Sequence, residues 1–397
     1  MNGLKYVSWG DNTGYAIAAK SYMRALIDAG INMTWAPMMP GPTGYEADVA
    51  HVGACKGLET VCNRDIEYDT VLIHTVPEYY PEWIAKERRL GRRILGYTVW
   101  ELERLPDHWP AILNQLDGVI VPCRWNVDVF RNSGVTVPIH LVPHLSQFER
   151  TDIVVPAEKA ALRGRLGKFA EEDDRFVFYT IGFWSHRKAP YLALEAYWKA
   201  FNANDRVLMV VKTCAKDITQ WRRHWKNAFR LRHPSPTQTV RALEKRYPGH
   251  APVVVIADEE LPDSQMLALH ARGDCFVSLT RTEGWGLGAF EAARLGKPIV
   301  MTRYGGQLDF LDADLAYLVD YQMVPVHEPT WSASYRPADK WAEPSVQQAA
   351  AYMRQVFEGQ AEARERATEL SKRVLREFSS EAIVTSLIEA LADRGGN

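Results

Sequence analysis

This 397-residue chain contains two successive series in which short apolar runs alternate with helical patterns. This alternation restricts the fold more than any other feature. The runs are nearly continuous in apolar residues, as in "TVLIH" (70–74) and "VLMVVK" (207–212). Continuous apolar strands joined by helices are typical of a parallel sheet that is covered on both faces. The sequence therefore predicts an α/β fold with two doubly wound, Rossmann-like domains.

The elements of both series can be located along the chain. Strands of the first series are predicted at 4–9, 31–35, 70–74, 93–100, 118–122 and 139–143, and helices at 14–29, 80–90 and 124–133. Strands of the second series are predicted at 176–182, 207–212, 252–257, 275–279 and 297–302, and helices at 190–201, 216–247, 263–271 and 288–295. In "PMMPGPTG" (37–44), prolines and glycines are expected to break regular structure.

A charged segment without apolar runs, around 146–172, separates the two series. A chain of this length ordinarily forms two domains, each large enough to bury its own core. We therefore expect an N-terminal domain over 1–160 and a C-terminal domain over 161–378. Ligands of open α/β sheets bind beyond the carboxyl ends of the strands, so the site is expected in the loops after 74, 100, 182, 212, 257 and 279.

The composition argues against several classes of protein. Lys and Arg number 47 and Asp and Glu 49, a formal net charge of −2, so no overall field attracts nucleic acid or an anionic membrane. The sequence holds no apolar run of the roughly 18 residues that span a bilayer, and its beginning lacks the layout of a signal peptide. The five cysteines form no CxxC pair and no tight cluster with histidine, so we expect reduced thiols in a cytoplasmic protein and no metal site.

One local segment departs from this balance of charge. "WRRHWKNAFRLRH" (221–233) carries five Lys or Arg, which suits an anionic membrane surface. A solvated helix face or a subunit contact explains the same pattern. Peripheral contact with the inner face of the cell membrane through 221–233 is therefore one of three alternatives for this segment.

The stretch "TEGWGLGAFEAARLG" (282–296) follows a predicted strand and contains the features of a ligand site. Its glycines permit positive φ angles and close approach of a ligand. The helix that follows presents free N–H groups and the positive end of its dipole, which suits a diphosphate. Glu283 lies in the loop and Glu291 one turn inside the helix, where each carboxylate can accept hydrogen bonds from sugar or ribose hydroxyls. This combination describes a nucleotide sugar; an ordinary turn with exposed glutamates is the alternative.

The same stretch resembles a known family. Glu283 and Glu291 reproduce the E-x7-E element of retaining glycosyltransferases with the GT-B fold, and residues 263–311 resemble glycosyltransferase family 4 throughout. The resemblance covers nearly the whole chain and implies that Glu283 contacts the donor sugar and Glu291 the ribose. It also implies that a C-terminal helix, 379–397, crosses back to the N-terminal domain. The backbone expected to hold the sugar and diphosphate is that of Trp285, Gly286, Leu287 and Gly288.

A second motif, "IGFWSHRKAP" (181–190), resembles the strand and loop that carry a basic pair to the diphosphate in this family. Lys188 fits the family's lysine best. Phe183 stands where the family has an arginine, so Arg187 is the candidate for that role. Two cations at this place can neutralise the charge that grows on a leaving diphosphate; a solvated Arg-Lys pair is the alternative.

Two further positions belong to the predicted donor site. Lys212 ends a strand on the same side, and a strand-end lysine that merely reaches solvent is its alternative. Gly14, in "WGDNTGYA" (9–16), resembles the small-residue turn through which the N-terminal domain contacts the diphosphate. This turn lacks the GxGxxG spacing of dinucleotide folds, which argues against NAD.

The acceptor side departs from the family's pattern. Many members have a histidine of the N-terminal domain facing the reaction centre, but "GYTVWELERLP" (96–106) holds none before His108. Glu101 is the candidate for the acceptor-side catalytic residue, with Glu103 and His74 as alternatives. His74 is equally compatible with a structural role.

The resulting hypothesis is a retaining, metal-independent hexosyltransferase. It would move a sugar from a UDP- or GDP-sugar to a hydroxyl of a carbohydrate or glycolipid acceptor, without a cofactor, since cationic side chains and helix N–H groups supply the positive charge. Residues 330–354 resemble relatives that build bacterial polysaccharides or glycolipids. The alternatives are an epimerase of the GT-B fold, a phosphorylase, and a non-catalytic protein that binds nucleotide sugars or carbohydrates.

Overall fold

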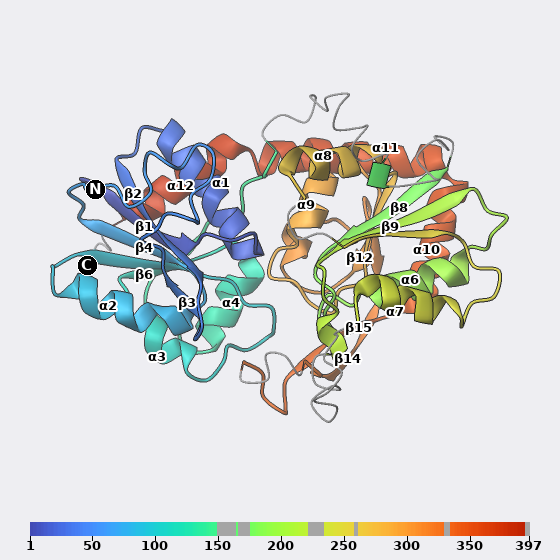
Figure 1. Cartoon of the computed structure of the whole chain (residues 1–397), viewed down its shortest axis with the longest axis horizontal. Helices are drawn as coiled ribbons and strands as arrows, with labels where there is room; N and C mark the ends of the chain where they lie inside the picture. Colours follow the sequence, from blue (N-terminus) through green and yellow to red (C-terminus); the bar gives the residue numbers. More distant parts are fainter. Residues whose placement is uncertain (149–163, 166–174, 221–233, 258–260, 329–333, 394–397) are drawn as a thin grey trace. The chain divides into compact units, whose positions relative to one another are not determined.

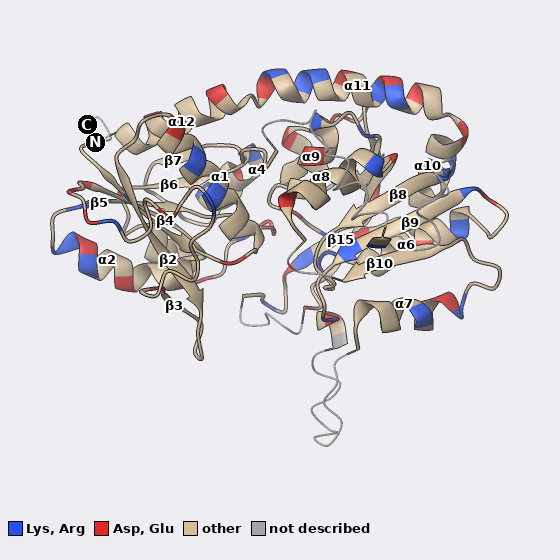
Figure 2. Cartoon of the chain, turned by 45° about the horizontal axis from the view of Figure 1, so that its top comes forward, with Lys and Arg blue, Asp and Glu red and all other residues tan. Residues whose placement is uncertain are grey.

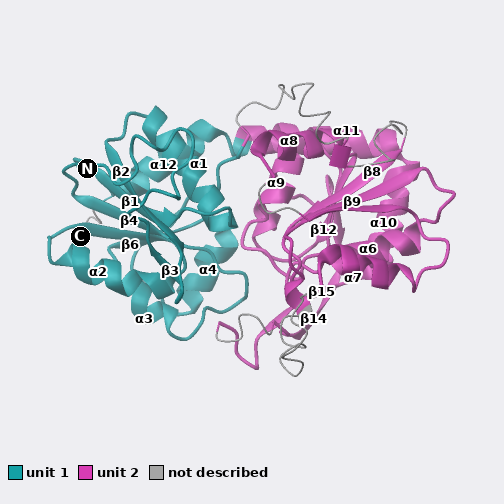
Figure 3. Cartoon of the chain, in the orientation of Figure 1, with its two compact units in different colours: residues 1–147, 377–397 teal, residues 148–376 magenta. Residues whose placement is uncertain are grey.

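The structure is a computed structural model that describes residues 1–148, 164–165, 175–220, 234–257, 261–328 and 334–393. Contacts divide the chain into two compact units, which Figure 3 colours separately. Unit 1 comprises residues 1–147 together with 377–397, and unit 2 comprises residues 148–376. The boundary expected at 160/161 falls within 149–163, outside the described residues.

Unit 1 is built on a seven-stranded sheet with the order β3-β2-β1-β4-β5-β6-β7. Neighbouring strands are parallel except for β3, which pairs antiparallel with β2. The strands are β1 (Leu4–Trp9), β2 (Met33–Pro40), β3 (Tyr45–Ala47), β4 (Thr70–His74), β5 (Arg93–Tyr97), β6 (Gly118–Val121) and β7 (Ile139–Leu141). The helices are α1 (Gly14–Asp28), η1 (Pro77–Tyr79), α2 (Tyr80–Arg88), α3 (Trp109–Leu113), α4 (Arg124–Asn132) and, from the end of the chain, α12 (Ser380–Ala392).

Unit 2 contains a six-stranded sheet with the order β10-β9-β8-β11-β12-β13, which is parallel throughout. Figure 1 shows α8 and α9 on one side of this sheet and α6 on the other. The strands are β8 (Phe176–Ile181), β9 (Val207–Thr213), β10 (Val253–Ala257), β11 (Cys275–Ser278), β12 (Ile299–Thr302), β13 (Tyr317–Val319) and an antiparallel pair, β14 (Tyr321–Pro325) with β15 (Lys340–Pro344). The helices are α6 (Pro190–Ala200), η3 (Ile218–Gln220), α7 (Pro236–Glu244), α8 (Asp263–Arg272), α9 (Leu287–Arg294), η4 (Gly306–Asp309), α10 (Val346–Glu358) and α11 (Gln360–Glu377).

The prediction of an α/β fold with two parallel, doubly wound sheets is confirmed. One local prediction was wrong: "PMMP" (37–40) does not break regular structure but continues β2. The carbonyl of Met38 accepts a hydrogen bond from Gly10 on the β1 side, so the neighbouring Pro37 faces the opposite edge. At that edge the carbonyl of Pro37 accepts a hydrogen bond from the N–H of Asp48. Proline is tolerated in a strand where its missing N–H faces away from the main ladder.

The segment between 303 and 345 was assigned no strands from the sequence, yet it forms β13, β14 and β15. These strands are three to five residues long, and β14 is mostly exposed. Strands β13 and β15 do have buried residues, but runs of three to five residues are too short to show a reliable hydrophobic period, so the pattern did not identify them. The β14–β15 pair matters below because Glu343 lies on β15.

The C-terminal helix α12 belongs to unit 1 (Figure 3). The guanidinium of Arg93, at the start of β5, donates hydrogen bonds to the carbonyls of Leu391, Ala390 and Asp393. These carbonyls at the end of a helix have no partner within the helix, and a cation there is favoured by the helix dipole. The preceding α11 shows basic and acidic residues interleaved along its length (Figure 2), as is typical of a helix with a solvated face.

Buried histidines make the stability of both units dependent on pH. His270 on α8 is 1% exposed and hydrogen-bonded to the hydroxyl of Tyr179 over 2.9 Å. Burial lowers the pKa of His270 to about 3, and it lowers the pKa of His144 in unit 1 to about 3 as well. These histidines are therefore neutral in the folded chain at pH 5, whereas in the unfolded chain they take up protons below the ordinary value of 6.5.

The free energy of unfolding is accordingly expected to fall as the pH is lowered from about 6.5 towards 3. Each histidine contributes a slope of about 1.4 kcal/mol per pH unit in that window. Urea unfolding between pH 7 and 4.5 should show a shallower slope for His270→Gln, which keeps a polar group next to Tyr179. The half-buried His250 in the same unit provides the control substitution His250→Gln. Identical slopes for His270→Gln and the unaltered chain would contradict the prediction.

Candidate functional site

The loop from the end of β11 to the start of α9 is shaped by glycine. Gly286, the N-cap of α9, has a φ angle of 90° and a left-handed conformation, which side chains other than glycine rarely adopt. This conformation turns the chain directly into α9, whose first N–H groups have no carbonyl partner within the helix. Leu287 and Gly288, whose backbone is predicted to hold the diphosphate, therefore lie in the first turn of a helix whose N-terminus favours anions.

Glu283, in this loop, forms an ion-paired cluster with the basic pair that follows β8. The Nζ atom of Lys188 lies 2.5 and 2.7 Å from the two carboxylate oxygens of Glu283. The Nη1 atom of Arg187 lies 3.5 Å from the same carboxylate and donates a hydrogen bond of 3.0 Å to the carbonyl of Thr282. Residues 95 positions apart thus meet at one point of unit 2.

The electrostatics of this cluster keep Glu283 ionised. Its side chain is only 8% exposed, and burial by itself would raise the pKa of the carboxyl group. The attraction of Lys188 and of Arg187, with the hydrogen bond from Lys188, outweighs that effect and holds the pKa below its ordinary value. A buried carboxylate that stays charged can accept hydrogen bonds from hydroxyl groups over the whole neutral pH range.

The main chain of Glu283 is hydrogen-bonded to the loop that follows β12. The N–H of Gly306 donates to the carbonyl of Glu283 over 2.8 Å. Gly305 has a φ angle of 110°, and a Cβ atom at this position would lie 2.5 Å from the same carbonyl oxygen. Only glycine therefore permits this close approach, which positions Glu283 between two loops.

Glu291 and Trp285 lie on either side of the same turn and are both enclosed. Glu291, on α9, is 2% exposed. Its negative charge acts on the guanidinium of Arg294. The pKa of Tyr179 is raised mainly by burial, and the charge of Glu291 adds to this increase. The Trp285 ring packs against Phe290 at 5.2 Å and Phe310 at 5.0 Å between centroids. The Trp285 side chain is thus part of the core.

Lys212 lies on the neighbouring part of the same sheet edge. It is paired in register with Ile181 on β8 and with Ile256 on β10, close to the carboxyl ends of all three strands. Its carbonyl accepts a hydrogen bond from the N–H of Gly182, which opens the loop that carries Arg187 and Lys188. The structure therefore brings Lys212, the basic pair and Glu283 to one edge of the unit 2 sheet.

The predicted residues of the N-terminal domain all belong to unit 1. Gly14 is the first residue of α1 and has open space around it. Glu101 follows β5 and is half-buried. The pKa of Tyr15 is raised mainly by burial, and the charge of Glu101 adds to this increase. Glu103 is exposed. His74 is 1% exposed at the end of β4, where the hydroxyl of Tyr6 lies 2.7 Å from its Nδ1 atom.

His74 is therefore part of the unit 1 core. Its ring lies 4.1 Å from that of Tyr97 between centroids, and burial lowers its pKa well below the ordinary value. A neutral imidazole enclosed by aromatic rings is the arrangement of a structural histidine. This environment favours the structural alternative for His74, while Glu101 and Glu103 stay candidates for the acceptor side.

Sequence reasoning missed three charged residues around the site, of which Arg281 and Glu328 are buried and Glu343 is half-buried. Arg281 and Glu343 form a bidentate ion pair with each other, and Glu328 accepts a hydrogen bond of 3.3 Å from the N–H of Arg187. Arg281 is two residues before Glu283 and two residues after the predicted strand 275–279, so its position offered a signal. Glu328 and Glu343 lie in or beside the strands that the pattern did not identify.

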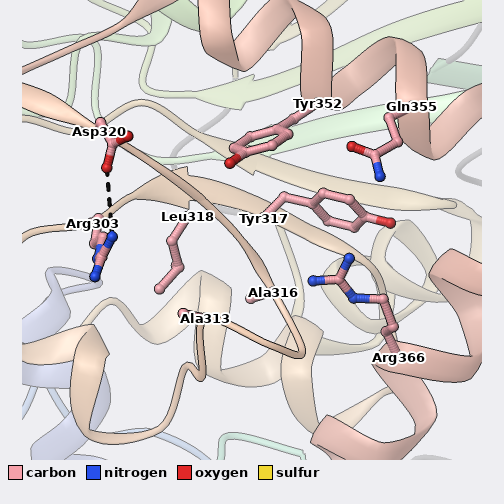
Figure 4. A pocket seen from close by; sticks show the side chains of 9 residues that line it. All are labelled: Arg303, Ala313, Ala316, Tyr317, Leu318, Asp320, Tyr352, Gln355 and Arg366. Carbon is pink, nitrogen blue, oxygen red and sulfur yellow. Dashed lines mark ion pairs between the residues drawn. The ribbon is translucent and has the colours of Figure 1, made fainter.

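A separate hollow of about 290 Å³ lies beside the edge strand β13 (Figure 4). It is lined by residues of the β12–β13 region, α10 and α11, and the guanidinium of Arg366 lies 4.5 Å from the centre of the Tyr317 ring. Arg303 and Asp320 at its rim form an exposed ion pair of 3.6 Å. None of the predicted site residues lines this hollow, so we locate the site by the chemistry of Glu283, Lys188 and Arg187.

Three expectations concern metals and membranes. Within the described ranges, no group of three or more His, Cys, Asp or Glu side chains is arranged to hold a metal ion. No helix in that part of the chain is long and apolar enough to cross a bilayer. The basic segment 221–233, considered for contact with an anionic membrane, lies outside the described residues.

A family model and several solved structures are similar to this chain. Residues 210–387 match the family described as "Family 4 Glycosyltransferase in conflict systems". This match confirms the resemblance to glycosyltransferase family 4 over the part of the chain that holds Lys212, Glu283 and Glu291. No curated protein matches the chain.

Solved structures of similar fold cover almost the entire chain. HepE of Anabaena in complex with UDP and glucose is 13% identical with a TM-score of 0.66, over 99% of this chain and 100% of that one. Sucrose-phosphate synthase of Thermosynechococcus elongatus is 14% identical with a TM-score of 0.67, over 98% of both chains. A UDP-forming trehalose-phosphate synthase of Burkholderia xenovorans is 12% identical with a TM-score of 0.63, over the full length of both. The chain has the GT-B fold that these structures share, with its two Rossmann-like units.

Proposed function

We propose that this chain, whose residues 210–387 match the family 4 glycosyltransferases and whose units have the GT-B fold, is a retaining glycosyltransferase. Its donor would be a nucleoside diphosphate sugar, and its acceptor a hydroxyl group of a carbohydrate or glycolipid. The observation that carries the proposal is the cluster of Lys188, Arg187 and Glu283 beside the N-terminus of α9.

This cluster combines the two kinds of group that a nucleotide sugar requires. Lysine offers three N–H donors and arginine five, and together with the helix N-terminus they suit the oxygens of a diphosphate. The ionised Glu283 offers acceptors for sugar hydroxyls within reach of the same cations. Glu291, one turn into α9, is proposed to bind the ribose.

The proposed reaction breaks the bond between the anomeric carbon and the diphosphate oxygen, and the electron pair leaves with the diphosphate. The hydroxyl oxygen of the acceptor forms the new bond on the face that the diphosphate leaves, and its proton passes to the departing phosphate oxygen. Anomeric configuration is thereby retained. Lys188 and Arg187 would stabilise the charge that grows on the leaving group, which is worth several kcal/mol in comparable sites.

Several finer features of the proposal rest on relatives or on sequence alone. HepE binds UDP, which supports UDP-sugars ahead of GDP-sugars as donors. Glu101 is proposed as the acceptor-side residue and Gly14 as the unit 1 contact of the diphosphate. We further propose that the protein acts in bacterial polysaccharide or glycolipid synthesis in the cytoplasm. Contact with the membrane through residues 221–233 is part of this proposal.

A screen of UDP- and GDP-sugars for enzyme-dependent release of the nucleoside diphosphate tests the proposal. We expect release from one or a few donors, increased by addition of an acceptor sugar or glycolipid. The anomeric configuration of the product, measured by NMR coupling constants, tests retention. A chain that binds a nucleotide sugar without releasing the diphosphate under any acceptor would instead be the non-catalytic binding protein.

Transfer is also expected to persist without divalent metal. In this proposal, Lys188, Arg187 and the α9 N-terminus would supply the positive charge that a metal ion supplies in other transferases. Rates measured after dialysis against EDTA should equal those measured with added magnesium or manganese. Activity that disappears in EDTA and returns with manganese would contradict this prediction.

A further inference from the structure

The strongest unassigned feature of unit 2 is Arg281, a buried arginine just before Glu283. It is 9% exposed, and its guanidinium forms two hydrogen bonds with the carboxylate of Glu343, one from Nε and one of 2.9 Å from Nη2. It also lies over the rings of Trp341 and Tyr191, at 5.2 and 5.7 Å from their centres. The bidentate pair and the two rings fix the plane of the guanidinium.

Arg281 holds the loop of the basic pair through two consecutive carbonyls. Its Nη1 atom donates a hydrogen bond to the carbonyl of His186, and its main-chain N–H donates one of 2.8 Å to the carbonyl of Arg187. Nη1 also donates to the hydroxyl of Tyr191 over 2.7 Å, at the start of α6. These hydrogen bonds hold the loop at the two residues immediately before Lys188.

The loop needs such support because its backbone is strained. Ala189, directly after Lys188, has a φ angle of 41° and a left-handed conformation without being glycine. A residue with a side chain adopts this conformation at a cost in free energy, and it persists only where the surroundings enforce it. The contacts of Arg281 lie within three residues of Ala189 and provide part of this enforcement.

Arg281 in turn is anchored to the β14–β15 hairpin. Its carbonyl accepts a hydrogen bond of 3.1 Å from the N–H of Ala342, next to Glu343 on β15. The hairpin, Arg281 and the loop of the basic pair therefore form one connected unit. The two cations reach Glu283 from a backbone that this unit holds in place.

We propose that Arg281 is a positioning residue, which holds the 186–189 loop so that Arg187 and Lys188 present their charges to the diphosphate of the donor. Arg281 acts through the loop and does not itself contact the substrate. The inference rests on the proposed function for its ligand, while the loop support that it describes is measurable without any ligand.

The first measurement needs no ligand. Hydrogen exchange followed by mass spectrometry should show exchange at least about 10-fold faster in peptides covering 183–190 of Arg281→Met. Peptides from β9 should be unchanged. Arg303→Met is the matched control, because the side chain of Arg303, in the same unit, is exposed and forms an exposed ion pair with Asp320.

The second measurement compares ligands that differ by one phosphate. UDP and UMP, or GDP and GMP if the unaltered chain binds those, are titrated into the full-length chain. Arg281→Met is expected to bind the diphosphate about 10-fold more weakly and the monophosphate within about 2-fold of the unaltered chain. Turnover should fall by about 10- to 100-fold with little change in the KM of the acceptor. Arg281→Lys, which keeps the charge but not the fork of donors, should recover only part of both losses.

Glu343→Gln provides a milder variant if Arg281→Met does not fold, because it weakens the anchor and leaves Arg281 in place. Unchanged loop exchange and an unchanged preference for diphosphate over monophosphate in a folded Arg281 or Glu343 variant would overturn the inference while leaving the proposed function intact. Failure of the unaltered chain to bind any nucleoside diphosphate would overturn the proposed function, and the role of Arg281 with it.

Discussion

Replacement of Lys188 by Met is expected to lower the turnover of sugar transfer by about 10²- to 10³-fold. Lys188 would meet charge that is larger on the leaving diphosphate in the transition state than in the bound donor, so its loss acts mainly on the reaction rate. Affinity for the free nucleoside diphosphate should fall by about 10-fold at most, because Arg187 and the α9 N-terminus remain. Methionine keeps an apolar stem at a position where the lysine ammonium is largely engaged by Glu283.

The control for this variant is Lys199→Met on α6. The side chain of Lys199 is 40% exposed, and its ammonium lies 3.9 Å from Glu195. It should match the unaltered chain in turnover and binding. Thermal unfolding of Lys188→Met must also be followed, since the variant leaves the buried Glu283 with less compensating charge. Equal losses in turnover and in diphosphate affinity would show that Lys188 binds the ground state and does not act preferentially on the transition state.

Replacement of Glu291 and of Glu283 by Gln is expected to separate two functions of the E-x7-E element. Glu291→Gln should weaken binding of the free nucleoside diphosphate by about 10- to 100-fold, since charge-assisted hydrogen bonds to ribose hydroxyls contribute about 1.5–3 kcal/mol. Glu283→Gln should reduce transfer by about 10²-fold or more and reduce the selectivity among donor sugars. Its affinity for the free diphosphate should stay equal or rise, because Lys188 and Arg187 no longer neutralise a carboxylate.

Isothermal titration with the diphosphate, together with transfer assays, distinguishes the two glutamates. Glu358→Gln on α10, with a side chain that is 66% exposed, is the control for loss of a carboxylate in unit 2. Loss of diphosphate affinity in Glu283→Gln but not in Glu291→Gln would reverse the assignment. Full transfer activity in both variants would mean that residues 283–291 do not form a nucleotide-sugar site.

The parts of the fold that could be predicted are those with a local signature. The parallel strands are continuous apolar runs because both faces of each sheet are covered, as β9 shows in "VLMVVKT". The turn into α9 is visible because only glycine takes the backbone angle of Gly286 at low cost. Strand ends in such sheets share one edge, so the sequence also determined that Lys212 and Glu283 lie on the same side of unit 2.

Contacts between segments that are distant in sequence required the tertiary structure. Lys188 and Glu283 were expected to have separate partners, the diphosphate and the sugar, yet they contact each other across 95 positions. Arg281 and Glu343 are 62 positions apart, and the short strand that carries Glu343 has no periodic pattern. His74 ends a strand, as many catalytic residues do, but the aromatic rings packed around it show that it belongs to the core.

The physical reason for this division lies in the range of the interactions. Strand and helix patterns, and the glycine at a left-handed turn, reflect how a segment of a few residues meets water and its own backbone, so the sequence determined them by itself. Which loops meet beyond the sheet, which charges pair there and which histidine is enclosed depend on packing between segments far apart along the chain. Only the tertiary structure decided that Arg281 supports the loop of Arg187 and Lys188 and that Glu283 joins them.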